Sequence, residues 1–366
     1  MSAKITKYLA NWTAWVPVLA VLTLIATWGR DLPPALVVIS AVLLAAAVLA
    51  AVHHAEVVAH KVGEPFGSLV LAVAVTIIEV ALIVTLMISG GDKAQSLARD
   101  TVFAAVMITC NGILGISLLV GAIRRRIAVF NPEGTGGALA AVATIATLSL
   151  VLPSFTTSRP GPQFSPAQLG FAAVASLALY LLFVLVQTRR HRDYFLPITT
   201  AGKVIEEETH LEPPTSKAAM TSLGLLLVAL VAVVGLAKGV SPAIESAVAG
   251  AGLPQAVVGV VIALLVLLPE TIAAVRAAAR DRMQTSLNLA LGSAMASIGL
   301  TIPAIAIAMI WLPGPLLLGL GGTQMVLLAL TVVVGTLTVV PGRANVLQGG
   351  IHLGLLAVFL FLAASP

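Results

Sequence analysis

Eleven long runs of apolar side chains occupy most of this chain and limit what it can fold into. They lie at roughly 13–29, 34–52, 67–89, 101–122, 136–153, 166–187, 220–237, 254–275, 285–311, 315–340 and 345–364. About 20 consecutive apolar residues in a helix cross the hydrocarbon core of a bilayer. The sequence therefore predicts an all-α polytopic membrane protein with about eleven transmembrane helices.

The segments between these runs leave no room for a separate soluble domain. Charged residues make up 10% of the 366 residues, whereas soluble domains usually carry about a quarter. The single cysteine, Cys110, argues against thiolate metal sites, a disulfide framework and redox chemistry. The basic residues behind the net charge of +5 stand in short loops, so we expect the lipid bilayer as a partner and no nucleic acid.

The basic residues also predict an orientation. If Lys4 and Lys7 lie in the cytoplasm, alternate loops place 15 of the 20 Lys and Arg residues on that side. The other five are Arg30, Lys93, Arg99, Arg159 and Lys238. An excess of Lys and Arg in cytoplasmic loops is the rule for multi-pass proteins. We therefore expect a cytoplasmic N-terminus, a retained first helix rather than a cleaved signal, and a C-terminus outside.

A polar stretch at residues 188–217, which includes four glutamates, divides the chain. We interpret 1–33 as a tail with a leading helix, 34–187 as a first five-helix repeat and 218–366 as a second. Because five is odd, the second repeat enters the membrane with the opposite orientation, which is the topology of an inverted repeat. The stretch itself is interpreted as a solvated cytoplasmic linker, with a regulatory or cation-attracting role as the alternative.

Two acidic residues stand well inside apolar runs, whereas the other thirteen lie in loops, in tails or near span ends. These two are Glu79 and Glu270. An ionised carboxylate in the membrane costs several kcal/mol, so it usually faces a cavity or a partner. Each belongs to the second helix of its repeat, and an inverted repeat brings such positions together near mid-depth. The alternative is that each glutamate only forms hydrogen bonds to a neighbouring helix.

The residues around the glutamates suggest further ligands. Thr76 lies three residues before Glu79, on the same helix face, and offers a hydroxyl oxygen unless it bonds its own backbone. Pro269 precedes Glu270 and is expected to kink the helix and free carbonyl oxygens. In the next helices Thr109, Asn111 and Gly115 are mirrored by Asn288, Gly292 and Ser293. Their amide and hydroxyl oxygens suit a cation, while close helix packing is the alternative explanation.

Histidines stand at two further places. His53, His54 and His60 follow the second run and are interpreted as solvated loop residues, with proton sensing as the alternative. His352 lies in the last run and is interpreted as a packing residue or as a hydrogen-bond partner of a neighbouring helix.

Four short motifs extend over nearly the whole chain after the first helix. They are Gly63-Glu-Pro-Phe-Gly-Ser68 through Glu79, Leu268-Pro-Glu270, Asn288-Leu-Ala-Leu-Gly-Ser293 and Gly342-Arg-Ala-Asn345. With these motifs the chain resembles the cation/calcium exchanger superfamily. Within that superfamily it is similar to the bacterial branch of calcium/proton or sodium-potassium/proton antiporters.

The resemblance implies two alpha repeats that each give one essential glutamate, Glu79 and Glu270, to a central site. There, cytosolic cations exchange for protons. It also implies the bacterial inner membrane, and no cofactor beyond transported Ca²⁺, Na⁺, K⁺ or H⁺. Calcium/proton exchangers usually carry Gly-Asn before each glutamate, whereas Thr76 and Leu267 stand here, so the preferred cation stays open. Glu64 is interpreted as lining the cytosolic entrance or as anchoring the helix end.

The predicted function is secondary active transport by alternating access. Two neighbouring carboxylates in a dry site repel each other and favour protonation, whereas an arriving cation favours their ionised form, so protons and cations compete. The alternatives are a cation channel and a membrane-embedded hydrolase that uses the carboxylate pair. The chain has no Gly-x-x-x-x-Gly-Lys-Ser/Thr, His-Glu-x-x-His or Gly-x-Ser-x-Gly motif, so an enzyme is not expected. The oligomeric state is left open.

Overall fold

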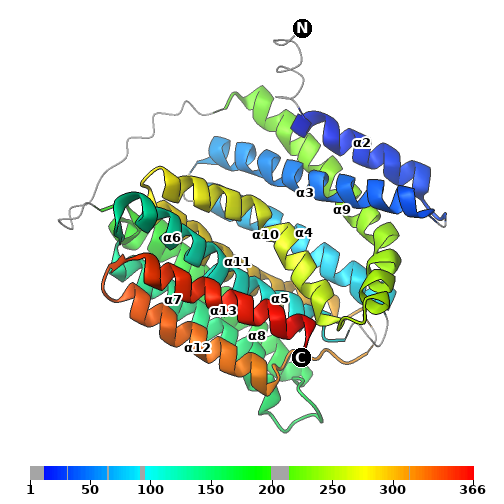
Figure 1. Cartoon of the computed structure of the whole chain (residues 1–366). Helices are drawn as coiled ribbons and strands as arrows, with labels where there is room; N and C mark the ends of the chain where they lie inside the picture. The colour runs from blue at the N-terminus through cyan, green and yellow to red at the C-terminus, as the bar shows by residue number, and fades with distance from the viewer. Residues whose placement is uncertain (1–11, 31, 64–65, 91–94, 199–213, 313) are drawn as a thin grey trace. The chain divides into compact units, whose positions relative to one another are not determined.

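The computed structural model describes residues 12–30, 32–63, 66–90, 95–198, 214–312 and 314–366 (Figure 1). Helices account for nearly all of the secondary structure in this part of the chain. They are α2 (Trp12–Thr27), α3 (Pro34–Val62), α4 (Phe66–Gly90), α5 (Leu97–Met107), α6 (Leu114–Arg125), α7 (Pro132–Ala146), α8 (Pro166–Leu185), α9 (Ser216–Gly250), α10 (Ala256–Ala279), α11 (Met283–Ala308), α12 (Gly322–Val339) and α13 (Val346–Ala364). A π-helix, η2 (Ile108–Ile113), joins α5 to α6 without a break.

The helices confirm a polytopic all-α membrane protein. Within the described residues, 10 helical segments are long and apolar enough to cross a membrane, counting α5, η2 and α6 as one. Helix α2 is also apolar, but its described part has only 16 residues. Each of the eleven apolar runs thus coincides with a helical segment.

Several helix boundaries differ from the predicted runs, and the end of the second run bears on the histidines. Helix α3 continues through Val62, so His53, His54 and His60 are helical and do not lie in a loop. The reason is local, because residues 53–62 contain no proline or glycine and are rich in Ala and Val. The helix ends at Gly63, whose φ of 77° is easily adopted only without a side chain.

Short polar motifs in the sequence set where several helices begin. The Asn131 side chain accepts hydrogen bonds from the backbone N–H of Glu133 and Gly134 at the start of α7. Ser165 with Gln168 and Asn345 with Gln348 do the same for α8 and α13 as capping boxes. Proline occupies the first position of α3, α7 and α8, where its missing N–H costs nothing.

The chain folds into two compact units. Unit 1 spans residues 1–94 and 211–252, and unit 2 spans 95–210 and 253–366. Each unit therefore takes helices from both sides of residues 188–217, and neither corresponds to one of the predicted five-helix repeats. In unit 1, α2, α3 and α9 pack against one another, and α4 packs against α3 and α9.

Unit 2 contains matching helices from the two halves of the chain. Helix α11, the third helix of the predicted second repeat, packs against α8, the fifth of the predicted first repeat. Correspondingly, α13, the fifth helix of the predicted second repeat, packs against α6 and η2 from the third span of the predicted first repeat. Helix α10 packs against α5, α6 and α11.

The loops of unit 2 gather at its two opposite ends. At one end, the β1 strand (Ala128–Val129) pairs antiparallel with the β2 strand (Arg343–Ala344). At the other end, Leu320 N–H donates to the Leu150 carbonyl, and Leu317 N–H donates to the Gln95 carbonyl. The third, fourth and fifth spans of the two predicted repeats consequently run in opposite directions, as an inverted repeat requires.

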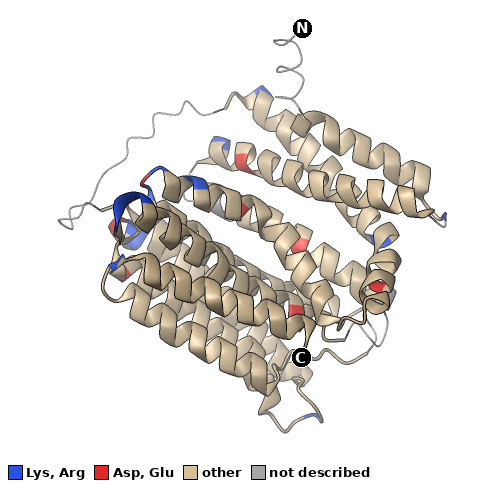
Figure 2. Ribbon diagram, viewed as in Figure 1, with Lys and Arg blue, Asp and Glu red and all other residues tan. Residues whose placement is uncertain are grey.

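Basic residues mark one of these ends (Figure 2). The end that carries the strand pair, here called the arginine end, includes Arg124, Arg125, Arg126, Arg280, Arg282 and Arg343. There, Arg124 Nη1 donates to the Ala279 carbonyl across 3.0 Å, which ties the end of α6 to the end of α10. This one-sided distribution within unit 2 is the pattern on which the predicted orientation rests.

Candidate cation site

The first glutamate lies on the buried face of α4, in unit 1. Glu79 is 3% exposed and Thr76 is 7% exposed, so both polar side chains are buried. Ile77, between them in sequence, is 46% exposed. The spacing of three residues thus places the hydroxyl and the carboxylate on one side of α4, as predicted.

The second glutamate lies in the middle of α10, in unit 2. Glu270 is half-buried and follows Pro269, which stands inside the helix. The ribbon of α10 changes direction near its middle (Figure 1). This bend agrees with the kink expected where proline removes a backbone donor and crowds the preceding turn.

Helices α10 and α11 form an antiparallel hairpin that sets the depth of Glu270. The turn at Arg280–Arg282 is tight, with Asp281 at a φ of 66°. Glu270 precedes Asp281 by as many residues as Gly292 follows it. At about 1.5 Å per residue, the carboxylate and the Gly292-Ser293 pair are therefore at similar depth in the two helices.

The Gly292-Ser293 pair borders open space. Both residues are half-buried, and a Cβ atom added at Gly292 would meet no atom within 4 Å. Gly292 is therefore not needed for a close contact between helices. Gly115, its mirrored residue, differs, because a Cβ there would lie 2.9 Å from His352 Cβ. Close packing against α13 explains why residue 115 is a glycine, whereas the glycine at position 292 leaves open space next to Ser293.

Thr109 and Asn111 lie in the π-helix η2, where their side chains are fully buried. The Thr109 hydroxyl donates to the Ala105 carbonyl of its own helix, across 2.7 Å. Asn111 Nδ2 donates to Thr331 Oγ1 of α12 across 2.9 Å, and Asn111 Oδ1 lies 3.1 Å from His352 Nδ1 of α13. An amide oxygen only accepts, so this histidine nitrogen is the donor.

Asn288 is held in a similar way at the arginine end of unit 2. Its Nδ2 donates to the Phe195 carbonyl across 2.7 Å, and its Oδ1 accepts from Gln284 Nε2 across 2.9 Å. Gln284 Oε1 in turn accepts from the Asn131 backbone N–H. The amides of Asn111 and Asn288 thus join helices, and their role as cation ligands stays a prediction.

The predicted site residues are divided between the two compact units. Glu270, Thr109, Asn111, Asn288 and Ser293 belong to unit 2. Residues of unit 1 are Glu79 and Thr76. The predicted entrance residue, Glu64, lies outside the described residues.

Two buried histidines have partners on other helices: the hydrogen-bond interpretation of His352 is confirmed, whereas the loop interpretation of His54 is wrong. His352 is 0% exposed and, besides Asn111, contacts Thr338 Oγ1 across 3.1 Å through Nε2, so it does bond to a neighbouring helix. His54 is 4% exposed, with Nε2 2.9 Å from the Thr13 carbonyl of α2 and Nδ1 3.3 Å from Ser222 Oγ of α9. For His352 the signal in the sequence is a histidine inside an apolar run, whereas His54 follows its run and is buried because α3 continues past it.

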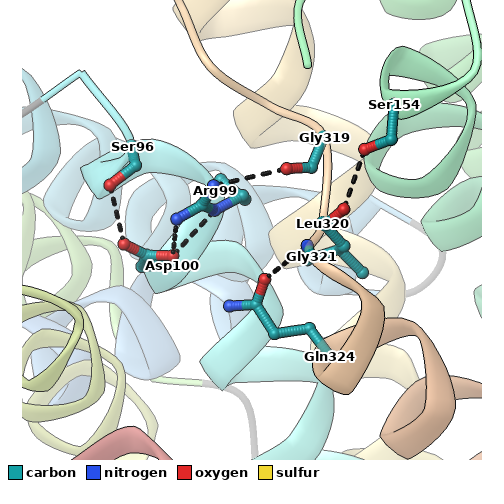
Figure 3. Close-up of polar contacts among 8 residues, drawn as sticks. All are labelled: Ser96, Arg99, Asp100, Ser154, Gly319, Leu320, Gly321 and Gln324. Carbon is teal, nitrogen blue, oxygen red and sulfur yellow. Dashed lines mark hydrogen bonds and ion pairs between the residues drawn. The ribbon is translucent and has the colours of Figure 1, made fainter. Parts of the chain in front are cut away.

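An ion pair lies at the opposite end of unit 2 (Figure 3). Arg99 Nη2 lies 2.8 Å from Asp100 Oδ1, and Ser96 Oγ donates to the other oxygen of Asp100 across 2.9 Å. Arg99 Nη1 also donates to the Gly319 carbonyl, across 3.3 Å. The pair therefore ties the start of α5 to the segment between α11 and α12. The prediction placed Arg99 in a loop, but α5 includes it, and its neighbour Asp100 is 5% exposed.

Comparison with known proteins agrees with this architecture. The family model for the sodium/calcium exchanger protein matches residues 32–189 and 221–364. A putative ionic transporter, y4hA of Sinorhizobium fredii, is 47% identical over 362 residues, covering 97% of this chain and 96% of the relative. The sodium-potassium/proton antiporter ChaA of Escherichia coli is 34% identical over 351 residues, covering 94% of this chain and 93% of the relative.

Solved structures share the fold at low sequence identity. The H⁺/Ca²⁺ exchanger CAX superposes with a TM-score of 0.73 at 14% identity, covering 97% of this chain and 88% of the other. Native YfkE gives a TM-score of 0.70 at 17% identity, covering 97% and 99%. From the matched family model and the two relatives, we conclude that the chain belongs to the sodium/calcium exchanger protein family and is a membrane transporter that exchanges cations, not an enzyme.

Proposed function

We propose that this transporter exchanges cytosolic Ca²⁺, Na⁺ or K⁺ for external protons, and that Glu79 and Glu270 bind both. The observation that carries the proposal is the position of these carboxylates. Each stands deep in an apolar span, at matching places in two predicted repeats whose third to fifth spans run in opposite directions. A carboxylate is rarely retained at such depth without a cavity or a charged partner.

Competition for the same oxygens couples the two fluxes. Protonation removes the negative charge that attracts a cation, and a bound cation favours the ionised carboxylates. A site that holds either protons or a cation, opened to one side at a time, lets the proton gradient drive cations outward. Thr76 and Ser293 are the neutral oxygens that we assign beside the carboxylates, since one is buried next to Glu79 and the other borders open space.

The names of the relatives support proton coupling but differ in the cation. The ChaA relative is a sodium-potassium/proton antiporter, and the CAX structure is that of an H⁺/Ca²⁺ exchanger. The greater sequence identity to ChaA favours Na⁺ and K⁺. The absence of Asn from positions 76 and 267 agrees with this choice, because it removes two amide oxygens that calcium would use.

We further propose the bacterial inner membrane as the location, with the N-terminus in the cytoplasm. The ten apolar spans within the described residues and the matched transporter relatives support a multi-pass protein of this membrane. The orientation is supported by the basic residues at the arginine end of unit 2, which the positive-inside rule assigns to the cytoplasm.

Transport in inside-out vesicles with a fluorescent pH indicator tests the proposal. In acid-loaded vesicles, addition of Na⁺, K⁺ or Ca²⁺ to the wild-type protein should release protons from the lumen. Glu79→Gln and Glu270→Gln keep the side-chain size but remove the charge, so each should abolish cation-dependent proton release. Glu133→Gln, at an exposed site in the first turn of α7, is the matched control and should transport normally.

Two results would contradict the proposal in different ways. Normal exchange by the Glu79→Gln or Glu270→Gln protein, inserted at wild-type levels, would disprove the two-glutamate site. Cation flux without any proton movement in the wild-type protein would instead favour a channel, with the glutamates as a selectivity filter.

A further inference from the structure

A cavity of about 490 Å³ opens within unit 1, between the C-terminal end of α2, the segment that follows it and the second half of α9. Leu24, Leu32 and Val37 contribute apolar walls. Where α2 meets α9, a Cβ atom at Gly235 would collide with the Leu24 side chain, so the two helices are in close contact there. The cavity lies next to this contact, at the end of unit 1 that contains Trp28 and Arg30.

Two positive charges line the cavity. Arg30 follows the end of α2 and Lys238 lies within α9, and both are exposed. Lys238 Nζ lies 5.7 Å from the ring centroid of Trp28, which also lines the cavity. Among the described residues, neither Arg30 nor Lys238 forms a salt bridge, and the cavity has no acidic residue in its lining. The described lining therefore carries two positive charges, which can attract an anion, while Asp31, next to Arg30 in sequence, lies outside the described residues.

The position of these charges is unusual in the predicted topology. Arg30 and Lys238 are two of the five basic residues assigned to the outer side, against the general excess inside. Trp28 is 63% exposed, as expected for an indole at the level of the lipid headgroups. Apolar walls beside two cations and an interfacial tryptophan match the parts of a phospholipid, namely a phosphate next to acyl chains.

We propose that this cavity binds the phosphate of an anionic phospholipid, with Arg30 and Lys238 contacting the phosphate oxygens and Trp28 lying beside the glycerol region. The site is independent of the exchange reaction and of Glu79 and Glu270. A bound lipid would link α2 to α9, because its phosphate would contact a residue that follows one helix and a residue within the other. It should therefore stabilise unit 1 against unfolding.

Lipid binding to the purified protein in a neutral detergent tests this inference. Phosphatidylglycerol, phosphatidylcholine and inorganic phosphate are added separately, and bound lipid is counted by native mass spectrometry alongside the midpoint of thermal unfolding. Phosphatidylglycerol should bind and raise the midpoint, and phosphatidylcholine should do so less. The Arg30→Gln/Lys238→Gln protein should bind phosphatidylglycerol about tenfold more weakly or worse.

Matched variants separate a specific site from general attraction. Lys238→Arg keeps the charge and should retain binding, while Arg159→Gln removes an exposed outer charge from unit 2 and should change nothing. Equal phosphatidylglycerol binding by the wild-type and doubly substituted proteins would overturn the proposal. An equal response to inorganic phosphate alone would overturn the assignment to a lipid and indicate a site for free anions.

Discussion

At the scale of single residues, the competition between protons and cations should be visible in the pH dependence of binding. Protonation of Glu79 or Glu270 removes charge from the cation site, so cation affinity should fall as the pH is lowered. The apparent dissociation constant should rise by at most about tenfold per pH unit for each competing proton. Cation titrations of the purified protein across a pH series measure this directly. A dissociation constant that does not change with pH would contradict competition at a shared site.

A second prediction concerns the buried His352. Its Nε2 lies 3.1 Å from Thr338 Oγ1, and both residues are almost completely buried. Thr338→Val keeps the shape but removes the hydroxyl, which leaves a buried imidazole nitrogen without this partner. We expect a loss of about 1–3 kcal/mol in the free energy of unfolding. Denaturant titration of the detergent-solubilised protein measures it.

The control for this variant stands two residues earlier on the same helix. Thr336 is exposed, and its hydroxyl donates to the Val332 carbonyl of its own backbone. Thr336→Val should therefore change the unfolding free energy by less than about 0.5 kcal/mol. Equal effects of the two substitutions would show that the bond between Thr338 and His352 does not contribute to stability.

At the scale of helices, adjacent glycines in α13 provide a sharp test of packing. A Cβ atom at Gly349 would lie 2.7 Å from the Leu119 backbone nitrogen and 3.0 Å from the Gly115 carbonyl oxygen. Because backbone cannot easily move aside, Gly349→Ala should force α13 away from α6 and destabilise the protein by about 1–3 kcal/mol. The midpoint of thermal unfolding should fall accordingly.

Gly350 is the matched control, since a Cβ atom there would meet nothing within 4 Å. Alanine is also a better helix former than glycine, so Gly350→Ala should leave the midpoint unchanged or raise it slightly. A fall of the same size in both variants would mean that helix propensity, and not the contact between α6 and α13, determines the result.

At the scale of the whole molecule, the proposed topology assigns the two ends of unit 2 to opposite sides of the membrane. The single native cysteine, Cys110, is buried, so cysteines introduced at exposed sites can be labelled against a low background. Ser158→Cys should react with an impermeant maleimide added outside cells from which the outer membrane has been removed. Arg343→Cys, at the arginine end, should react only after the membrane is permeabilised. The reverse pattern would invert the proposed orientation.

The sequence alone was enough for the spans, their order and the two intramembrane glutamates. Runs of about 20 apolar residues are a direct consequence of bilayer thickness, and a charge inside such a run is recognisable without any fold. Helix ends were less predictable, as α3 shows by extending its helix past the apolar run to Gly63. There, local helix propensity, and not hydrophobicity, determines the boundary.

Only the tertiary structure decided what the buried polar side chains contact. Asn111 and Asn288 have the same motif in sequence. Asn111 nevertheless donates to Thr331 of α12, 220 residues away, whereas Asn288 donates to Phe195 of η6 (Arg192–Phe195), 93 residues away. The same holds for Gly115, which fits against α13, and for Gly292, which borders open space. Membrane insertion depends on the composition of each span by itself. Hydrogen bonding and close packing depend on which spans meet, and no local pattern in the chain specifies that.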